Sequence, residues 1–322
     1  MNSALTVPLI LGGGGRLGRA LESVLVSLHP TTVCATRAEI DITDYFGMLE
    51  QFERLQPSLV INCAALADVD RCEIDPDLAR HVNTEGAAHV ARACAQSGAR
   101  LIHLSTDQVF DGTKRGPYTE DDPPAPLSRY GASKREGELR LLAELPRALV
   151  VRTSWLFGPG GGDFVERCIN LARREGCIGG VIDQVACPTY TPDLAEALMR
   201  LARGSASGVL HFANTGTCTR FEFACRIAQL AGLPAGLERR PLRWADLDRP
   251  ARRPANSALC TARYTLVTSC MPRPWEEALV VHLEALGLRR QPNSGGAHRP
   301  TKPGTDRSFR GASRLHPGWP GE

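Results

Sequence analysis

Hydrophobic positions in the first half of the chain alternate between short unbroken runs and longer stretches in which they recur every three to four residues. The unbroken runs are typical of strands buried on both faces, whereas the recurrent pattern is typical of helices that cover a sheet with one face. The runs predict strands at 4–11, 31–36, 58–65, 100–106 and 147–158. The recurrent pattern predicts helices at 16–28, 44–55, 76–98 and 129–145.

This alternation of strands and helices predicts an α/β fold, namely a Rossmann-type, doubly wound parallel sheet. Right-handed crossovers would bring the carboxyl ends of the strands to one edge, where ligands bind. We therefore expect residues 1–160 to form an NAD(P)-binding Rossmann domain, with its sheet completed by later segments. The pattern then becomes less regular, with helices expected at 163–176, 188–203, 221–233 and 272–286. Residues 161–288 are expected to form mainly a smaller C-terminal substrate-binding lobe.

The last segment, 289–322, has no apolar period and is rich in Pro, Gly, Ser and Arg. Such a composition cannot bury enough surface to offset chain entropy, so we expect a disordered basic tail.

Composition excludes several classes of function. The formal net charge of +3 gives no argument for a nucleic-acid partner. The sequence shows no apolar run long enough for a bilayer and no basic region of a signal peptide, so no membrane partner is expected. The 11 cysteines contain no C-x-x-C pair and lie mostly in apolar runs. Reduced thiols of this kind favour a cytoplasmic protein without a cysteine metal site.

A run of glycines separates the first predicted strand from the first predicted helix. In LILGGGGRLGRAL, Gly12, Gly15 and Gly18 follow a G-x-x-G-x-x-G spacing. The first glycine permits a tight turn, the second lets the backbone reach a pyrophosphate, and the third lets the helix pack closely on the strand. Free N–H groups at the helix N-terminus would then bind the phosphates. The strand–turn–helix context therefore favours dinucleotide binding over a plain glycine loop.

The residues after the second predicted strand bear on the choice of cofactor. NAD-specific sites usually have an acidic residue there, whereas this sequence has Thr36 and Arg37. The Arg37 guanidinium is suited to a 2′-phosphate, although it would look the same if it were simply solvated. The pattern favours NADPH and leaves NADH open.

Two groups of polar residues predict a reductase site. Ser105, Thr106 and Asp107 end the fourth predicted strand, and Tyr130 and Lys134 begin the next helix one turn apart. After hydride transfer to a carbonyl, Tyr130 would give the developing alkoxide a proton. A nearby Lys134 ammonium would lower the pKa of the phenol, and Thr106 would hydrogen-bond the same oxygen. A Tyr-x-x-x-Lys spacing is common in ordinary helices, so the hypothesis depends on the glycine turn and the strand-end hydroxyls.

Several longer segments make the sequence similar to a known family. They include LIHLSTDQVFDG, SRYGASKREGE, VVRTSWLFGPGGG and RPANSAL. With these segments the chain, from about Leu9 to Leu286, resembles the extended short-chain dehydrogenase/reductases and, among them, the dTDP-4-dehydrorhamnose reductase family. The resemblance implies an NAD(P)H-dependent reductase that converts dTDP-4-dehydro-6-deoxy-L-mannose to dTDP-L-rhamnose.

The resemblance also implies individual roles. For the cofactor it implies Gly15, Arg16 and Leu17 at the pyrophosphate, Asp41 and Ile42 beside the adenine, and Ala65, Leu66 and Ala67 after the third strand. For the reaction it implies Tyr130 and Lys134 as the catalytic pair, which also contacts the cofactor, Thr106 and Asp107 on the sugar, and Trp155 packed against it. A strand-end Asp also often caps a turn, and a Trp often belongs to the core.

The sequence departs from the family pattern at two positions. Gln108 stands where the family usually has an aromatic residue, and Leu66 stands where it often has His or Tyr. A reductase of another nucleotide-linked keto sugar therefore remains an alternative. A further alternative is a non-catalytic, NADP-binding regulatory subunit that resembles the β subunit of methionine adenosyltransferase. The acidic residues that hold magnesium in the family are not identified here, so no metal is predicted, and a homodimer is left open.

Overall fold

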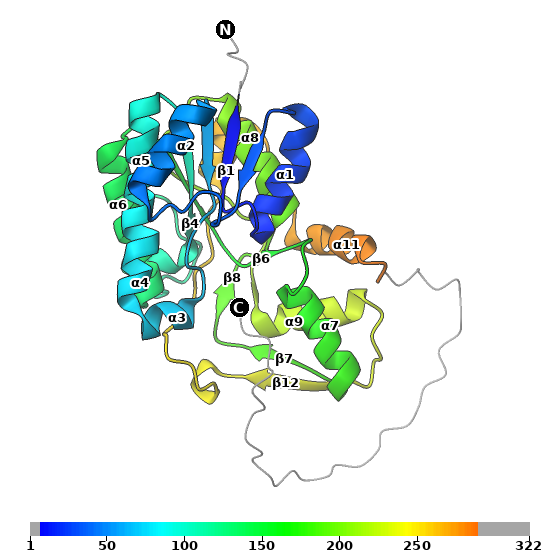
Figure 1. Ribbon diagram of the computed structural model, residues 1–322. Coiled ribbons are helices and arrows are strands. Elements are labelled where there is room, and N and C mark those ends of the chain that lie inside the picture. The colour runs from blue at the N-terminus through cyan, green and yellow to red at the C-terminus, as the bar shows by residue number, and fades with distance from the viewer. Residues whose placement is uncertain (1–6, 289–322) are drawn as a thin grey trace, which may run out of the picture.

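In the computed structural model, which describes residues 7–288, the central element is a six-stranded parallel sheet with the order β10-β5-β4-β3-β1-β2 (Figure 1). Its strands are β1 (Pro8–Leu11), β2 (Val33–Ala35), β3 (Leu59–Asn62), β4 (Arg100–Thr106), β5 (Leu149–Thr153) and β10 (Gly208–His211). The chain runs outward from β1 to β2 and then returns past β1 to β3. This reversal places a crevice at the carboxyl ends of β1 and β3, where doubly wound sheets bind ligands. The predicted fold class is confirmed.

Helices cover both faces of the sheet, which explains why its strands are continuously apolar. Helices α1 (Arg16–Leu28) and α8 (Thr191–Arg203) lie on one face, and α2 (Tyr45–Leu55), α5 (Gly86–Ser97) and α6 (Arg129–Glu144) lie on the other (Figure 1). Along β1, Ile10 packs into the first of these layers, whereas Leu9 and Leu11 pack into the second. Alternate side chains of a strand point to opposite faces, so each strand contributes to both cores.

The helix predicted at 76–98 is continuous, but one of its turns is π-helical rather than α-helical. It consists of α4 (Pro76–Arg80), a π-helical turn η1 (His81–Glu85) and α5, and it ends at Gly98 with φ 75°. Asp75 caps its start by accepting a hydrogen bond from the Leu78 N–H. The π turn was not predicted. It brings Asn83 and the next residue against α6, where the Asn83 amide donates to the Ser133 hydroxyl at 3.0 Å. A short helix before it, α3 (Val69–Ile74), was also not predicted.

The single strand predicted at 147–158 is wrong, because two strands occupy this segment. β5 ends at Thr153, and β6 (Leu156–Phe157) pairs instead with β9 (Thr189–Tyr190). Between them the backbone turns sharply, and Trp155 has φ 38°, a left-handed conformation that is uncommon for a residue with a large side chain. The turn directs the chain out of the sheet toward the second part of the molecule.

A smaller lobe lies at the carboxyl edge of the sheet (Figure 1). Its helices are α7 (Phe164–Glu175), α9 (Arg220–Leu230) and α11 (Trp275–Ala285), which share an aromatic core with Phe157 and Phe223. Its short strands form the pairs β7 (Cys177–Val181) with β12 (Glu238–Leu242) and β8 (Val185–Ala186) with β11 (Cys218–Thr219). The remaining elements are η2 (Asp107–Val109), η3 (Trp244–Asp246) and α10 (Ala262–Thr268). Within 161–288, α8 and β10 belong to the sheet layer. The predicted tail at 289–322 lies outside the described residues.

Candidate active site

The glycine turn after β1 is shaped by close contacts that a side chain would prevent. Gly12 has φ 80°, and a Cβ there would lie 2.8 Å from the Ala64 nitrogen. A Cβ on Gly18 would lie 2.4 Å from the Gly12 carbonyl oxygen, so α1 approaches the turn as closely as the spacing predicted. Gly15 is the N-cap of α1 and supplies no side-chain cap. Within the described residues the buried Arg16 Nε also has no hydrogen-bond partner. Such a cradle of N–H groups fits a dinucleotide pyrophosphate.

Four further residues were expected at the cofactor: Asp41 and Ile42 beside the adenine, Arg37 at a 2′-phosphate, and Leu66 after the third strand. Arg37 is highly exposed beyond the end of β2, and its Nε donates to Asp41 Oδ2 at 3.0 Å. Burial opposes ionisation of Asp41, but hydrogen bonds from Thr43 and Arg37 hold its pKa below the usual range. Ile42 is buried in the core layer under α5. The Leu66 backbone is fixed by hydrogen bonds to the Asn83 amide.

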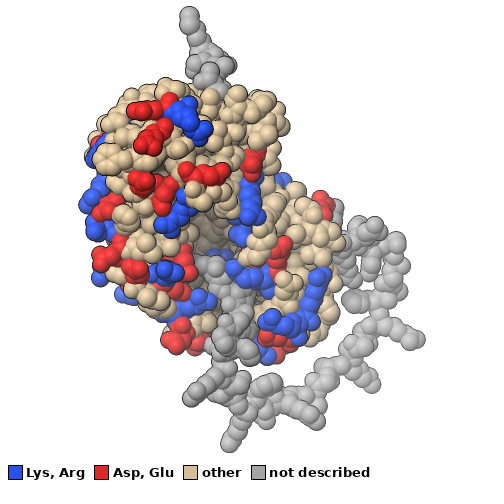
Figure 2. Space-filling view, in the orientation of Figure 1, with Lys and Arg blue, Asp and Glu red and all other residues tan. Residues whose placement is uncertain are grey.

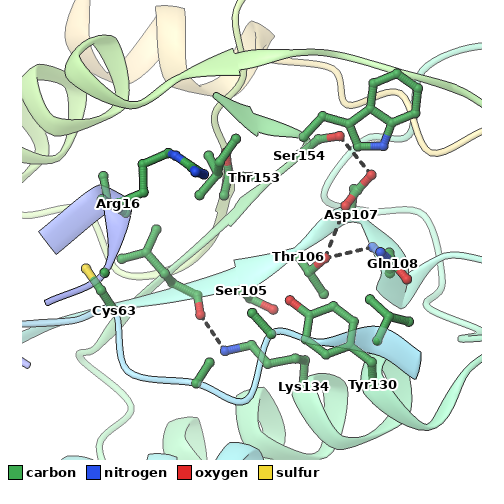
Figure 3. A pocket seen from close by; sticks show the side chains of 18 of the residues that line it. Arg16, Cys63, Ser105, Thr106, Asp107, Gln108, Tyr130, Lys134, Thr153 and Ser154 are labelled. Atoms are coloured by element: carbon green, nitrogen blue, oxygen red, sulfur yellow. Dashed lines mark hydrogen bonds between the residues drawn. The ribbon is translucent and has the colours of Figure 1, made fainter. Parts of the chain in front are cut away.

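At the end of β4, Asp107 is held by three hydroxyl groups. Its Oδ2 accepts a hydrogen bond from Ser154 Oγ at 2.8 Å, and its Oδ1 accepts one from Thr106 Oγ1 at 3.1 Å (Figure 3). Its Oδ2 also accepts one from Ser257 Oγ at 2.5 Å. The carboxylate is only 3% exposed. Ser257 comes from the RPANSAL segment, so a residue 150 positions away orients this side chain.

Tyr130 and Lys134 extend from the first turns of α6 toward the end of β4 (Figure 3). Ser128 caps this helix by accepting a hydrogen bond from the Gly131 N–H. Lys134 is 3% exposed, and its Nζ donates to the Leu104 carbonyl at 2.7 Å. Burial lowers the Lys134 pKa from 10.5 to about 8, against the opposing influence of the Glu138 carboxylate and two thiols.

Beneath the pair, a buried ion pair joins α6 to the sheet. The Arg152 guanidinium on β5 donates to both oxygens of Glu138, at 2.8 and 2.7 Å, and Ser105 Oγ donates to Glu138 Oε1 at 2.6 Å. Burial alone would raise the pKa of Glu138, but Arg152 holds it below the usual range. The middle of α6 is thereby fixed to the ends of β4 and β5.

The smaller lobe contributes side chains that the sequence did not identify. The Arg220 guanidinium stacks 3.7 Å from the centre of the Trp155 ring, and it also faces Phe164 at 4.8 Å. Arg167 on α7 reaches the same space, which Gln108 also lines from η2 at the end of β4. Arg220 and Arg167 carry no motif, because only the folding of α7 and α9 over the sheet edge brings them there.

These groups line one cavity of about 450 Å³ between the sheet edge and the smaller lobe. Of the predicted residues, it is lined by Gly12, Gly15, Arg16, Leu17, Gly18, Ala65, Ala67, Thr106, Asp107, Tyr130, Lys134 and Trp155. Arg37, Asp41, Ile42 and Leu66 are not in its lining. Among residues 7–288 no cluster of His, Cys, Asp and Glu is arranged to hold a metal ion.

The glycine turn, the parallel sheet and the Tyr130–Lys134 pair facing one cavity define an oxidoreductase of the short-chain dehydrogenase/reductase type. A sequence profile described as the RmlD substrate binding domain matches residues 7–287. The chain belongs to this family.

Individual relatives agree with this assignment. A dTDP-4-dehydrorhamnose reductase of Mycobacterium tuberculosis is 42% identical over 284 residues, which are 86% of this chain and 92% of that protein. A dTDP-4-keto-6-deoxy-D-glucose reductase of Streptomyces niveus is 38% identical over 229 residues, which are 71% of this chain and 80% of that one. The crystal structure of dTDP-4-dehydrorhamnose reductase from Bacillus anthracis in complex with NADP superimposes with a TM-score of 0.84 at 33% identity, covering 87% of this chain and 99% of that one.

Proposed function

We propose that this protein reduces the 4-keto group of dTDP-4-dehydro-6-deoxy-L-mannose with NADPH, giving dTDP-L-rhamnose. One observation carries the proposal: the phosphate-binding turn and the Tyr130–Lys134 pair face the same cavity. The similarity to dTDP-4-dehydrorhamnose reductases over most of the chain supports the same substrate.

The cofactor would be held mainly by the first turn of α1. Gly12, Gly15 and the Arg16 backbone would bind its pyrophosphate, and Ala65 and Ala67 would lie along its length. Arg37, which now pairs with Asp41 at the exposed end of β2, would meet a 2′-phosphate. When bound, NADPH supplies the hydride that reaches the carbonyl carbon.

The chain's own residues would manage the proton. Tyr130 would donate its phenolic proton to the oxygen that becomes the alcohol, and Thr106 would hydrogen-bond that oxygen. The Lys134 ammonium would stabilise the phenolate that Tyr130 leaves behind. Asp107, already oriented by Ser154 and Ser257, would accept hydrogen bonds from sugar hydroxyls. Trp155 would pack on the sugar ring.

The direct test is a turnover assay. Purified protein, NADPH and the keto sugar nucleotide should give a loss of NADPH absorbance and a product identified as dTDP-L-rhamnose. Absence of NADPH oxidation with this substrate would refute the proposed activity.

The Tyr130→Phe substitution tests the proton donor. It removes only the hydroxyl, so we expect turnover to fall by roughly 10²–10⁴-fold while NADPH affinity stays within a factor of two to three. The control is Tyr45→Phe, which removes a hydroxyl that accepts a hydrogen bond from the exposed Gln96 and does not line the cavity. Persistent activity in Tyr130→Phe would show that another group supplies the proton.

The alternative substrate is another nucleotide-linked keto sugar. Gln108 lines the cavity beside Asp107, at a position where the family usually has an aromatic ring, and the Streptomyces niveus relative carries a different substrate name. A panel of keto sugar nucleotides, compared by kcat/KM, separates the two. A regulatory subunit would instead bind NADPH without turning over any member of the panel.

We also propose a cytoplasmic location, supported by the free thiols of all 11 cysteines, which are typical of a reducing compartment. None of the helices within residues 7–288 is both long and apolar enough to cross a bilayer. A homodimer remains an expectation, to be tested by sedimentation.

A further inference from the structure

Behind Lys134, on the side away from the cavity, lies a buried histidine with an unusual set of neighbours. His103 on β4 is 1% exposed, and its Nε2 lies 3.3 Å from Lys134 Nζ. Its other ring nitrogen, Nδ1, lies 3.1 Å from the amide nitrogen of Asn62, which ends β3. The three side chains form a buried row from one strand to the next and then to α6.

The backbone fixes the direction of these hydrogen bonds. Asn62 Oδ1 accepts a hydrogen bond from the Ala64 N–H at 3.0 Å, so its Nδ2 faces the imidazole. An amide nitrogen only donates, and His103 Nδ1 must therefore accept. In a neutral imidazole with an accepting Nδ1, the proton is on Nε2. That N–H points at Lys134.

An ammonium group has three donors and no acceptor, so it cannot accept this hydrogen bond, whereas a neutral amine can. A neutral Lys134 satisfies both contacts, accepting from His103 Nε2 and still donating to the Leu104 carbonyl.

The other groups around Lys134 favour its protonated form instead. The Glu138 carboxylate, one turn along α6, and the thiols of Cys63 and Cys72 favour the ammonium. Glu138 is already bound by Arg152 on β5, which limits its attraction for Lys134. Burial raises the pKa of both thiols to about 11 or 12, so they are uncharged at neutral pH. Tyr130, one turn before Lys134, faces the cavity (Figure 3), which His103 does not line.

We infer that His103 is a positioning residue for Lys134: its Nε2–H, whose position is set by Asn62, holds the lysine against β4 and favours the neutral amine. The inference rests on the proposed role of Lys134 in supporting Tyr130. The contact with His103 sets the pH at which the Lys134 ammonium is lost. With His103 in place, the lysine releases its proton close to physiological pH. Without it, the ammonium should persist to higher pH.

Nuclear magnetic resonance on the full chain tests this without any substrate. Lysine occurs at only three positions, 114, 134 and 302, so the ¹³Cε resonance of Lys134 can be assigned by its loss in Lys134→Met. We expect it to titrate near pH 8 in the wild type. The ¹⁵N spectrum of labelled histidine, with His103 assigned by its loss in a variant, should show the proton on Nε2. A proton on Nδ1 would overturn the inference.

Two substitutions at His103 separate the effect of its hydrogen bond on Lys134 from the effect of its volume. His103→Leu removes the donor, and the midpoint of Lys134 should rise by roughly half a unit to one unit. His103→Gln can accept from Asn62 and donate to Lys134 in the same way, so it should restore the wild-type midpoint. An unchanged or lower midpoint in His103→Leu would refute the inference, because burial alone would then account for the state of Lys134.

His211→Leu is the matched control. His211 is also buried, but it lies on β10, two strands from β4, and its Nδ1 bonds the Tyr118 carbonyl. Its loss should leave the Lys134 midpoint unchanged. In turnover assays the alkaline limb of kcat/KM should move with the midpoint in the His103 variants. A protein whose lysine titrates as expected but that reduces no keto sugar would refute the proposed function and leave the His103–Lys134 contact established.

Discussion

Lys134 occupies a position that costs stability. Its pKa is lowered from 10.5 to about 8, chiefly by burial. The unfolded chain therefore binds the proton more tightly than the folded chain, and stability from this group rises with pH between these two values. Below about pH 8 the full cost applies, and the difference between the two pKa values corresponds to about 3 kcal/mol. The lysine is retained at a site where an apolar side chain would be more stable.

The Lys134→Met substitution should therefore stabilise the fold while it abolishes turnover. We expect a gain of roughly 1–3 kcal/mol in the free energy of unfolding at about pH 7, shrinking to well under half of that at about pH 10. Urea unfolding at the two pH values measures both quantities. Lys114→Met is the control, because Lys114 is partly exposed in its ion pair with Asp122 and should change stability little. A Lys134→Met protein that is less stable at neutral pH would contradict this account.

At the scale of elements, the turn between β1 and α1 depends on individual glycines to different degrees. A Cβ at Gly18 would lie 2.4 Å from the Gly12 carbonyl oxygen, so α1 would have to move. At Gly14 the nearest atom would be Thr36 Cγ2, at an ordinary contact distance of 3.6 Å. The two positions therefore differ in what they tolerate, although both belong to the same glycine-rich turn.

Gly18→Ala should weaken NADPH binding at least tenfold and destabilise the fold by roughly 1–3 kcal/mol, because the helix N-terminus is pushed away from the pyrophosphate. Gly14→Ala should leave both quantities nearly unchanged. Fluorescence titration with NADPH and thermal unfolding of the two variants provide the comparison. Equal losses in both would mean that the turn needs backbone freedom rather than close packing.

The elements also show what could be predicted from the sequence. Helix α1 begins and ends at the predicted residues, as does β4, because apolar periodicity and bounding glycines or polar residues are local signals. The break after β5 was missed because Trp155 has a left-handed backbone and packs against Arg220 of the smaller lobe, and neither feature has a local signal in the sequence. The pair β7 and β12 joins segments about 60 residues apart, with no local pattern to indicate it. Tertiary contacts override propensity in such elements.

The residues of the site likewise divide into those with a local signal in the sequence and those that only tertiary contacts bring together. Tyr130 and Lys134 are one turn apart on a helix, so their shared face followed from spacing alone. Arg220 reaches the cavity, and Ser257 reaches Asp107, only because the chain returns to the sheet edge. The buried contact of His103 with Lys134 joins two elements, so it too needed the structure. The roles of these residues stay predictions until the variants are measured.

At the scale of the whole molecule, the sheet edge and the smaller lobe enclose the cavity together and supply different residues to it. The sheet edge supplies the glycine turn and Tyr130, while the smaller lobe supplies Arg167 and Arg220. Figure 2 shows the hollow between the two parts, flanked by Lys and Arg side chains. Arg16 and Arg167 also bind the carbonyls of Gly161 and Gly162, so the glycine-rich connection between the parts is anchored from both sides. An anionic diphosphate sugar would therefore meet guanidinium groups where the lobes face each other.

The Arg220→Gln substitution tests this arrangement of the two parts. Arg220 is stacked on Trp155 at the start of α9, and a charge-assisted bond from it to the substrate diphosphate would be worth about 1.5–3 kcal/mol. We expect KM for the keto sugar nucleotide to rise at least tenfold, kcat to change much less, and the Kd for NADPH to stay the same, because the cofactor would be held by the other part. Arg226→Gln is the matched control, since Arg226 lies on the same helix and bonds Gln229 at the surface. If Arg220→Gln weakened NADPH instead of the sugar nucleotide, the cofactor and not the substrate would occupy the space beneath the smaller lobe.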